Sequence, residues 1–208
     1  EVWYGVIRLF RDYGYRRMRT KARLKFLLAE WGPAEFRAVL ESEYLDSPLP
    51  DGPEAVASGL PADHVGVHSQ KDGRVYVGLA PTVGRVSGDI LAALADAAEA
   101  AGSGRIRFTP HQKLLVLDVD PARLDGLLAA VEPLGLSANP SPFRRSTMAC
   151  TGIEYCKLAF VDTKDTAVRT VAELEQRLAD TTLDRPISLH LNGCPNSCAR
   201  IQVADIGL

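Results

Sequence analysis

Four cysteines, grouped in two close pairs, constrain this 208-residue chain more than any other feature of its sequence. Cys150 and Cys156 are separated by five residues in "CTGIEYC", and Cys194 and Cys198 by three in "CPNSC". Thirty-seven residues lie between the two pairs, and the chain has no other cysteine. A site that uses all four thiols must therefore bring two distant segments together.

Four interpretations of these cysteines stay open at this point. Disulfide bonds need an oxidising compartment, and no feature of the sequence indicates secretion. A structural zinc site usually has two to four residues between paired cysteines, so a gap of five is loose for it. Free thiols pack as small hydrophobic residues, but four of them in two clusters would be a coincidence. An iron–sulfur cluster takes four thiolates at varied spacing, and we favour it.

Local patterns predict how each pair is presented. The second pair stands at positions i and i+4, which predicts a shared helix face, and Pro195 suits the first turn of that helix. The amides of Asn196 and Ser197 would then point at an anionic cluster at the helix start. The first pair is six residues apart and out of phase on a helix, so we expect it on a loop that wraps around the cluster.

Composition places the chain among folded domains, with 46% hydrophobic and 24% charged residues. A net charge of -2 gives no reason to expect binding to nucleic acid or a membrane. No apolar run approaches the roughly 20 residues of a membrane span, and no signal peptide is visible, so we expect a cytoplasmic location. The chain opens on "EVWYGVIRLF" and ends on the strand-like "IQVADIGL", from which we expect a piece of a longer polypeptide.

The first quarter of the chain predicts helices and then a linker. Residues 1–46 have apolar side chains at helical spacing, with Gly32 as a stop and with Trp3 and Trp31 expected in the core. Residues 47–63 are rich in proline and have little periodicity, which predicts a linker.

The rest of the chain predicts two α+β regions. Residues 64–137 have the order β-β-α-β-β-α, with Ser87 and Asp120 as helix N-caps, which predicts one sheet with helices on one face. Residues 138–208 alternate between helix and strand and predict a separate α/β domain. Its expected elements are a loop over 137–156, a helix over 166–180, and strands at 187–191 and 200–208.

"TMACTGIEYCKLA", followed by "LNGCPNSCARIQVADIGL", resembles the cluster-binding signature of the siroheme-dependent nitrite and sulfite reductases, which is C-x5-C with a later G-C-P-N-x-C. "HVGVHSQKDGRVYVGLAPTVGR" and "GSGRIRFTPHQKLLVLDV" resemble the second ferredoxin-like half domain of that family. "RDYGYRRMRTKARLKFLLAEWG" resembles the segment that closes its first half. The resemblance covers nearly the whole chain apart from the linker.

The resemblance implies an α+β architecture in four parts. They are a helical tail of the preceding domain over 1–46, a linker over 47–63, a ferredoxin-like half domain over 64–137, and a truncated α/β [4Fe–4S]/siroheme domain over 138–208.

It also implies roles for the cysteines and for residues near them. Cys150, Cys156, Cys194 and Cys198 would ligate a [4Fe–4S] cluster, and Cys198 would be catalytic because its thiolate would join the cluster to the siroheme iron.

Three polar residues match cofactor-binding positions of the family. Asn196 and Arg200 match motif positions beside the cofactors, and Gln112 falls where the family has a glutamine near the macrocycle. Lys113 stands where several members have asparagine, so no contact is carried over to it.

Siroheme is rich in carboxylates, so the resemblance implies a cationic pocket. Between Arg8 and Lys25 the chain has eight Lys or Arg residues and one acidic residue. Arg23 and Lys25 match basic positions of the family segment, and Arg144 and Arg145 could pair with a macrocycle carboxylate or with the anionic cluster. The plain alternative for all of them is a solvated surface.

The resemblance implies an oxidoreductase, namely part of an assimilatory sulfite reductase that takes electrons from a ferredoxin-like donor for the six-electron reduction of sulfite to sulfide. We favour sulfite because "FTPHQKLLVLD" resembles the actinobacterial sulfite reductases. The alternatives are nitrite reduction to ammonia, a non-catalytic iron–sulfur electron-transfer module and a zinc-stabilised interaction module. Family members hold substrate mainly through the first half of the polypeptide, so we expect the isolated fragment to be inactive.

Overall fold

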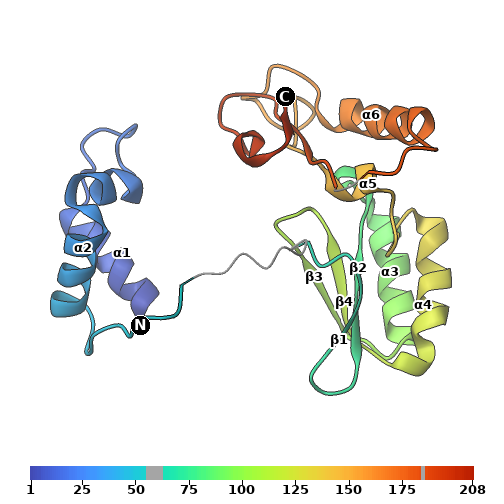
Figure 1. Ribbon diagram of the computed structural model, residues 1–208, viewed down its shortest axis with the longest axis horizontal. Helices are drawn as coiled ribbons and strands as arrows, with labels where there is room; N and C mark the ends of the chain where they lie inside the picture. The colour runs from blue at the N-terminus through green and yellow to red at the C-terminus, as the bar shows by residue number, and fades with distance from the viewer. Residues whose placement is uncertain (55–62, 184–185) are drawn as a thin grey trace. The chain divides into compact units, whose positions relative to one another are not determined.

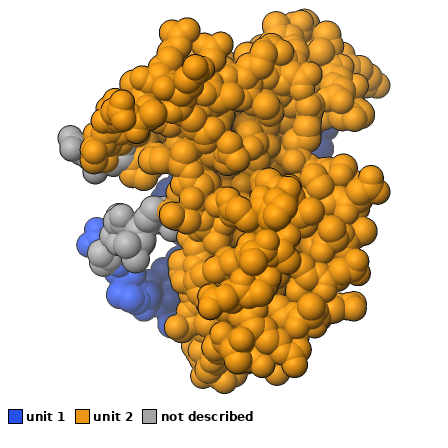
Figure 2. Space-filling view, turned by 90° about the vertical axis from the view of Figure 1, so that its right-hand side faces the viewer, with its two compact units in different colours: residues 1–59 blue, residues 60–208 orange. Residues whose placement is uncertain are grey.

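The structure, a computed structural model, describes residues 1–54, 63–183 and 186–208. It divides into two compact units, residues 1–59 and 60–208 (Figure 1). Figure 2 shows the second unit as one continuous body. The predicted linker falls largely on residues 55–62, which lie outside the described residues. In the described part of the chain, no helix is long and apolar enough to cross a membrane.

The first unit is helical, as predicted. Helix α1 spans Val2–Tyr13 and helix α2 spans Leu24–Glu43. Within α2, Gly32 adopts φ 77° and breaks the helix in two, which agrees with the two helices expected on either side of it. The core of this unit consists of Leu9, Leu27, Phe36 and Leu40.

The two tryptophans of this unit behave differently. Trp31 packs against the core as predicted. The prediction that Trp3 is a core residue is wrong within this unit, because its side chain is 79% exposed. The buried face of α1 runs through Gly5 and Leu9, and Trp3 lies off that face.

The half domain has the predicted order β-β-α-β-β-α. Its antiparallel sheet has the strand order β1-β2-β4-β3, and both helices lie against the same face of the sheet (Figure 1). The elements are β1 (Gly66–Ser69), β2 (Val75–Leu79), α3 (Gly88–Ala100), β3 (Arg105–Phe108), β4 (Leu114–Val119) and α4 (Leu124–Val131), with short 3-10 turns at Thr82–Gly84, Pro121–Arg123 and Glu132–Leu134.

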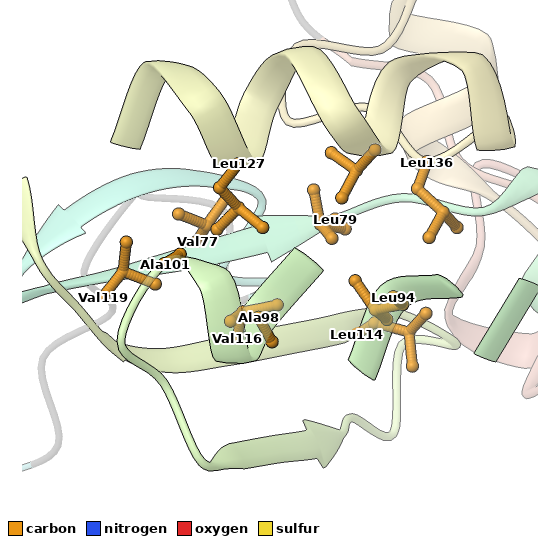
Figure 3. Close-up of a cluster of buried hydrophobic side chains, with 11 residues drawn as sticks. Val77, Leu79, Leu94, Ala98, Ala101, Leu114, Val116, Val119, Leu127 and Leu136 are labelled. Atoms are coloured by element: carbon orange, nitrogen blue, oxygen red, sulfur yellow. The ribbon is translucent and has the colours of Figure 1, made fainter. Parts of the chain in front are cut away.

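The predicted caps and core of the half domain are present. The hydroxyl of Ser87 accepts from the amide of Ile90, and the carboxylate of Asp120 accepts from the amide of Ala122. Aliphatic side chains from the sheet meet those of α3 and α4 in one buried layer (Figure 3). This layer includes Val77, Leu79, Leu94, Val116, Leu127 and Leu136.

The C-terminal region is built on a short parallel sheet with the strand order β5-β6-β7. Its elements are α5 (Pro142–Ser146), β5 (Thr147–Ala149), α6 (Lys164–Arg177), β6 (Leu189–Leu191), a 3-10 turn at Ile201–Val203, and β7 (Ile206–Gly207). Five buried residues form its core, and one of them, Val83, comes from the half domain. This region therefore packs directly on the half domain.

Two predictions for this region are wrong in part. The expected loop over 137–156 contains α5 and β5, because Ser141 caps a helix by accepting from the amide of Arg144. The expected strand over 200–208 is reduced to two residues. Arg200 adopts a left-handed φ of 56°, and the 3-10 turn that follows it interrupts the extended chain.

Candidate functional site

The four cysteines line one cavity with a volume of about 550 Å³. The structure thus brings together the two pairs that the sequence predicted would meet. The cavity is also lined by Thr151, Tyr155, Lys157, Leu158, Ala159, Asn192 and Asn196.

Neighbouring parallel strands explain why the pairs meet. Cys150 directly follows β5, and Asn192 directly follows β6, which leads into the second pair. Ala149 and Leu191, the last residues of the two strands, are partners in the parallel register. The carboxyl ends of adjacent parallel strands lie at one edge of a sheet, so both cysteine segments start from the same edge.

The second pair lies on turns, so the predicted helix over Cys194 and Cys198 is wrong. Ser197 adopts a left-handed φ of 57°, which a continuous helix does not allow. Instead, the side-chain oxygen of Asn192 accepts from the amide of Ala199 at 2.8 Å and closes the turn. Cys198 is exposed, whereas the other three cysteines are half-buried.

The first pair lies on a loop, as predicted. Gly152 adopts φ 76°, and a Cβ atom there would lie 2.6 Å from Thr163 Oγ1. Glycine therefore lets the loop approach the start of α6 closely. The amide of Cys156 donates to the carbonyl of Gly152 at 3.0 Å and tightens the loop.

Cys150 has the most hydrogen-bonded surroundings of the four cysteines. Its Sγ accepts from the amide of Gly193 at 3.2 Å. Thr163 Oγ1 lies 3.6 Å from the same sulfur and donates to the carbonyl of Cys150 at 2.8 Å. Lys164 donates to the carbonyl of Val83, and burial lowers its pKa while the Cys150 sulfur opposes that change. A nearby amide and ammonium both stabilise a thiolate.

The donor set fits an iron–sulfur cluster better than a single metal ion. Among the described residues, no three Cys, His, Asp or Glu side chains are grouped closely enough to hold one ion. A zinc ion with Zn–S bonds of about 2.3 Å would need sulfurs roughly 3.8 Å apart. Four thiols around a cavity of about 550 Å³ leave room for a larger group. Asn192 lines this cavity, and its buried amide nitrogen has no hydrogen-bond partner among the described residues.

A second cavity, of about 260 Å³, contains the predicted residue Arg200. The Arg200 guanidinium lies 3.4 Å from the carbonyl of Pro110 and 3.5 Å from Nδ1 of His111. Burial, and then the charge of Arg200, lowers the pKa of His111. His190 also lines this cavity, and its Nδ1 lies 3.1 Å from the carbonyl of Arg200.

Arg144 and Arg145 each have a carboxylate partner within the chain. Arg145 makes two hydrogen bonds of 2.8 Å to Asp63. Burial would raise the pKa of Asp63, but the hydrogen bonds from Arg145 and from a backbone amide outweigh it and lower that pKa. Arg144 donates to Glu175 at 3.0 and 3.2 Å. A role for these arginines toward cofactor carboxylates stays a prediction.

Gln112 bonds to the strand that leads into the first cysteine. Its Nε2 donates to the carbonyl of Ala149 at 2.6 Å, and its Oε1 accepts from the amide of Ala149 at 3.2 Å. Two hydrogen bonds with Gln112 thus hold the residue directly before Cys150 in place. Lys113 beside it is 2% exposed, and burial lowers its pKa to about 8 against the opposing charge of Asp63.

Two predicted cofactor residues, Arg23 and Lys25, belong to the first unit. Arg23 donates to the carbonyl of Ala22 at 2.9 Å, and Lys25 Nζ lies 5.3 Å from the ring centre of Phe26. Their predicted role toward siroheme stays a prediction. Asn196, in contrast, lines the cysteine cavity.

Three residues of the site were not predicted from the sequence: Thr163, Gly193 and Asn192. A signal for Thr163 was present, because two residues with good capping side chains stand together before α6. Asp162 accepts from the amide of Thr166 at 2.9 Å and caps the helix, which leaves the Thr163 hydroxyl for Cys150. Gly193 and Asn192 immediately precede Cys194, and only the tertiary structure places the Gly193 amide against Cys150 and the Asn192 side chain against Ala199.

Two family models match this chain. The nitrite and sulphite reductase 4Fe-4S domain matches residues 1–49 and 141–208, and the nitrite/sulfite reductase ferredoxin-like half domain matches residues 68–134. This chain belongs to the nitrite and sulfite reductase family. The predicted family and the α+β fold class are confirmed. So are the predicted cofactors, because this family binds a [4Fe–4S] cluster and siroheme.

Individual relatives are similar over the whole chain. The chain is 59% identical to Sulfite reductase [ferredoxin] 2 of Mycolicibacterium paratuberculosis and 58% identical to Sulfite reductase [ferredoxin] of Mycobacterium tuberculosis. It is 41% identical to the assimilatory ferredoxin-dependent nitrite reductase of Haloferax mediterranei. The structure of the Mycobacterium tuberculosis NirA protein matches all of this chain and 38% of its own length, with a TM-score of 0.95 and 58% identity. This chain spans 37–38% of the length of the relatives named here.

Proposed function

We propose that this chain is part of an assimilatory, ferredoxin-dependent sulfite reductase that reduces sulfite to sulfide with six electrons. The observation that carries the proposal is a single cavity lined by four thiols, in a chain 58–59% identical to sulfite reductases. Four thiolates converging on one space are the ligand set of a [4Fe–4S] cluster.

The cysteines have distinct places in this proposal. All four would hold the cluster, and Cys198 would also link it to siroheme. The exposure of Cys198 supports this assignment, because a thiolate shared with a second cofactor must be reachable from outside the cluster cavity. When bound, the cluster and siroheme supply electron storage and an iron at which the substrate binds.

The other residues of the site stabilise negative charge on the thiolates and on the cofactors. The amide of Gly193 and the ammonium of Lys164 stabilise negative charge at Cys150, and Lys157 lines the cavity. We assign Arg200, Arg23 and Lys25 to the carboxylates of siroheme, which need cationic partners when they leave water.

The partners follow from the same proposal. Electrons come from a ferredoxin-like protein, and the rest of the polypeptide supplies the substrate-binding side chains. We place the reaction in the cytoplasm, where four free thiols remain reduced.

Nitrite reduction to ammonia is the second candidate. It also takes six electrons, and the relative from Haloferax mediterranei at 41% identity is named as a nitrite reductase. The higher identity to sulfite reductases favours sulfite.

The test uses the holoenzyme purified without oxygen. We expect siroheme bands and a broad cluster shoulder in its absorption spectrum, and a higher kcat/KM for sulfite than for nitrite with reduced ferredoxin. A preference for nitrite would favour the second candidate. Cluster absorption without macrocycle bands would leave only an electron-transfer module, and stoichiometric zinc without iron would contradict both reductases.

A further inference from the structure

One buried side-chain amide at the cysteine cavity lacks a hydrogen-bond partner among the described residues. Asn192 lines this cavity, and its Nδ2 is buried and donates to no atom of the described chain. Among the described residues, only Thr147 Oγ1 shares this condition. An unpaired buried donor is costly and rare in folded proteins, so we expect the loaded protein to provide an acceptor next to Nδ2.

The orientation of this amide is fixed by its other end. Asn192 Oδ1 accepts from the amide of Ala199 at 2.8 Å, and the backbone amide of Asn192 donates to Leu208 at 2.7 Å. Rotating the side-chain amide by half a turn would place its NH₂ group against the N–H of Ala199. Nδ2 is therefore held as the group left free to bind another acceptor.

We propose that Asn192 Nδ2 donates a hydrogen bond to a sulfur of the cluster, so that Asn192 is a residue that sets the reduction potential. This inference rests on the proposed cluster in the cavity. Oδ1 of the same side chain closes the turn that carries Cys194 and Cys198, so one amide both shapes the ligand loop and contacts the group it holds.

Two neighbouring residues, Asn192 and Gly193, then each donate a hydrogen bond to a sulfur. The backbone amide of Gly193 already donates to Cys150 Sγ at 3.2 Å. A backbone amide is present whatever the side chain, whereas the Asn192 amide is lost on substitution. A donor to sulfur stabilises the extra electron of the reduced cluster and raises its reduction potential. Removing Nδ2 therefore shifts the potential to more negative values.

The test is an EPR-monitored redox titration of the anaerobically purified holoenzyme. Asn192→Asp keeps the oxygen that accepts from Ala199 and loses the donor. Thr151→Asp is the matched control, because it adds the same charge to the lining of the same cavity. We expect a negative shift of the cluster midpoint potential that is larger in Asn192→Asp than in Thr151→Asp. An equal or smaller shift would overturn the inference.

Electron–nuclear double resonance in H₂O and D₂O gives a second readout. We expect an exchangeable proton coupling that Thr151→Asp keeps and Asn192→Asp lacks. If Asn192→Asp does not load iron, the same measurement is made instead on wild-type protein labelled with ¹⁵N in its asparagine side chains. The label should then alter the nitrogen coupling of the reduced cluster, and an unaltered coupling would overturn the inference. A wild-type enzyme with no [4Fe–4S] signal would instead contradict the proposed function.

Discussion

The half domain, which contains β1 to α4, and the cysteine region, which contains α5 to β7, are stabilised in different ways. Eleven buried hydrophobic residues form one layer in the half domain, whereas the cluster of buried residues in the cysteine region has five, one of them from the half domain. A loop and α6 connect β5 to β6, turns connect β6 to β7, and this loop and these turns surround a cavity. We therefore expect the half domain to be stable through its own apolar burial, and the cysteine region to depend on a cluster bound in its cavity.

The strongest test of this contrast is removal of the cluster. Cys194→Ser should lose the iron and acid-labile sulfide of the cluster, because one of four ligands is missing. Hydrogen exchange should then rise in residues 147–163 and 186–200, while β2 and β4 keep their protection. Thr151→Ala, in the same cavity, should keep both the cluster and the exchange pattern. Equal loss of protection in both regions would contradict the contrast.

The next largest effect should come from the apolar layer of the half domain. Leu127→Ala removes a side chain that is 2% exposed and should lower the free energy of unfolding by about 2–5 kcal/mol. The neighbouring Leu128 is only partly buried, and Leu128→Ala should cost about 1 kcal/mol. Urea unfolding measures both. Similar losses for the two leucines would show that this layer does not carry the stability of the half domain.

Lys113 should give a pH-dependent effect where the two regions meet. Burial lowers its pKa from 10.5 to about 8 in the folded state, with Asp63 opposing and with Arg145 and Lys164 adding to the decrease. The unfolded state therefore binds the proton more tightly, and the resulting destabilisation is full below pH 8 and disappears as pH rises through 10.5.

Lys113→Met should therefore raise the free energy of unfolding at pH 7 by up to about 3 kcal/mol. The gain should shrink toward zero above pH 10.5. Urea unfolding of the wild type and the variant, at pH 7 and again above pH 10.5, measures this gain. A gain that is the same at both values would contradict the buried-charge explanation.

The smallest effect should come from the two hydrogen bonds between Gln112 and Ala149, which clamp the half domain to the cysteine region. Gln112→Ala removes two hydrogen bonds to Ala149 and should cost about 1–2 kcal/mol. Gln70 is a matched control, because its side chain makes two comparable bonds to Asp118 inside the half domain. Both variants should lose similar stability, but only Gln112→Ala should also slow iron loading, followed by absorption during reconstitution. Equal loading rates would show that the clamp does not position Cys150.

The same contrast explains what the sequence could predict. In the half domain, local signals and tertiary structure agree: Ser87 and Asp120 cap helices where they were expected, and the strands and helices occur in the predicted order. In the cysteine region, local rules favoured a helix at Cys194 and Cys198, but the left-handed Ser197 and the Asn192–Ala199 bond impose turns.

Convergence of the cysteines could be predicted because their spacing matches a family signature. The contacts that complete the site could not. Gly193 and Thr163 reach Cys150 from 43 and 13 residues away, through the pairing of β5 with β6 and the start of α6. The place of Gln112 near the macrocycle stays a prediction, and its hydrogen bond to Ala149 was not predicted. Such contacts depend on tertiary placement, on which local periodicity has no information.

The central claim is that one [4Fe–4S] cluster is held by all four cysteines. The most direct measurement is EPR of the dithionite-reduced holoenzyme, together with iron and sulfide analysis, for the wild type and four single Cys→Ser variants. We predict a reduced-cluster signal in the wild type that is lost or strongly changed in every variant. A signal that survives unchanged in Cys150→Ser and Cys156→Ser, or zinc in place of iron, would contradict the claim.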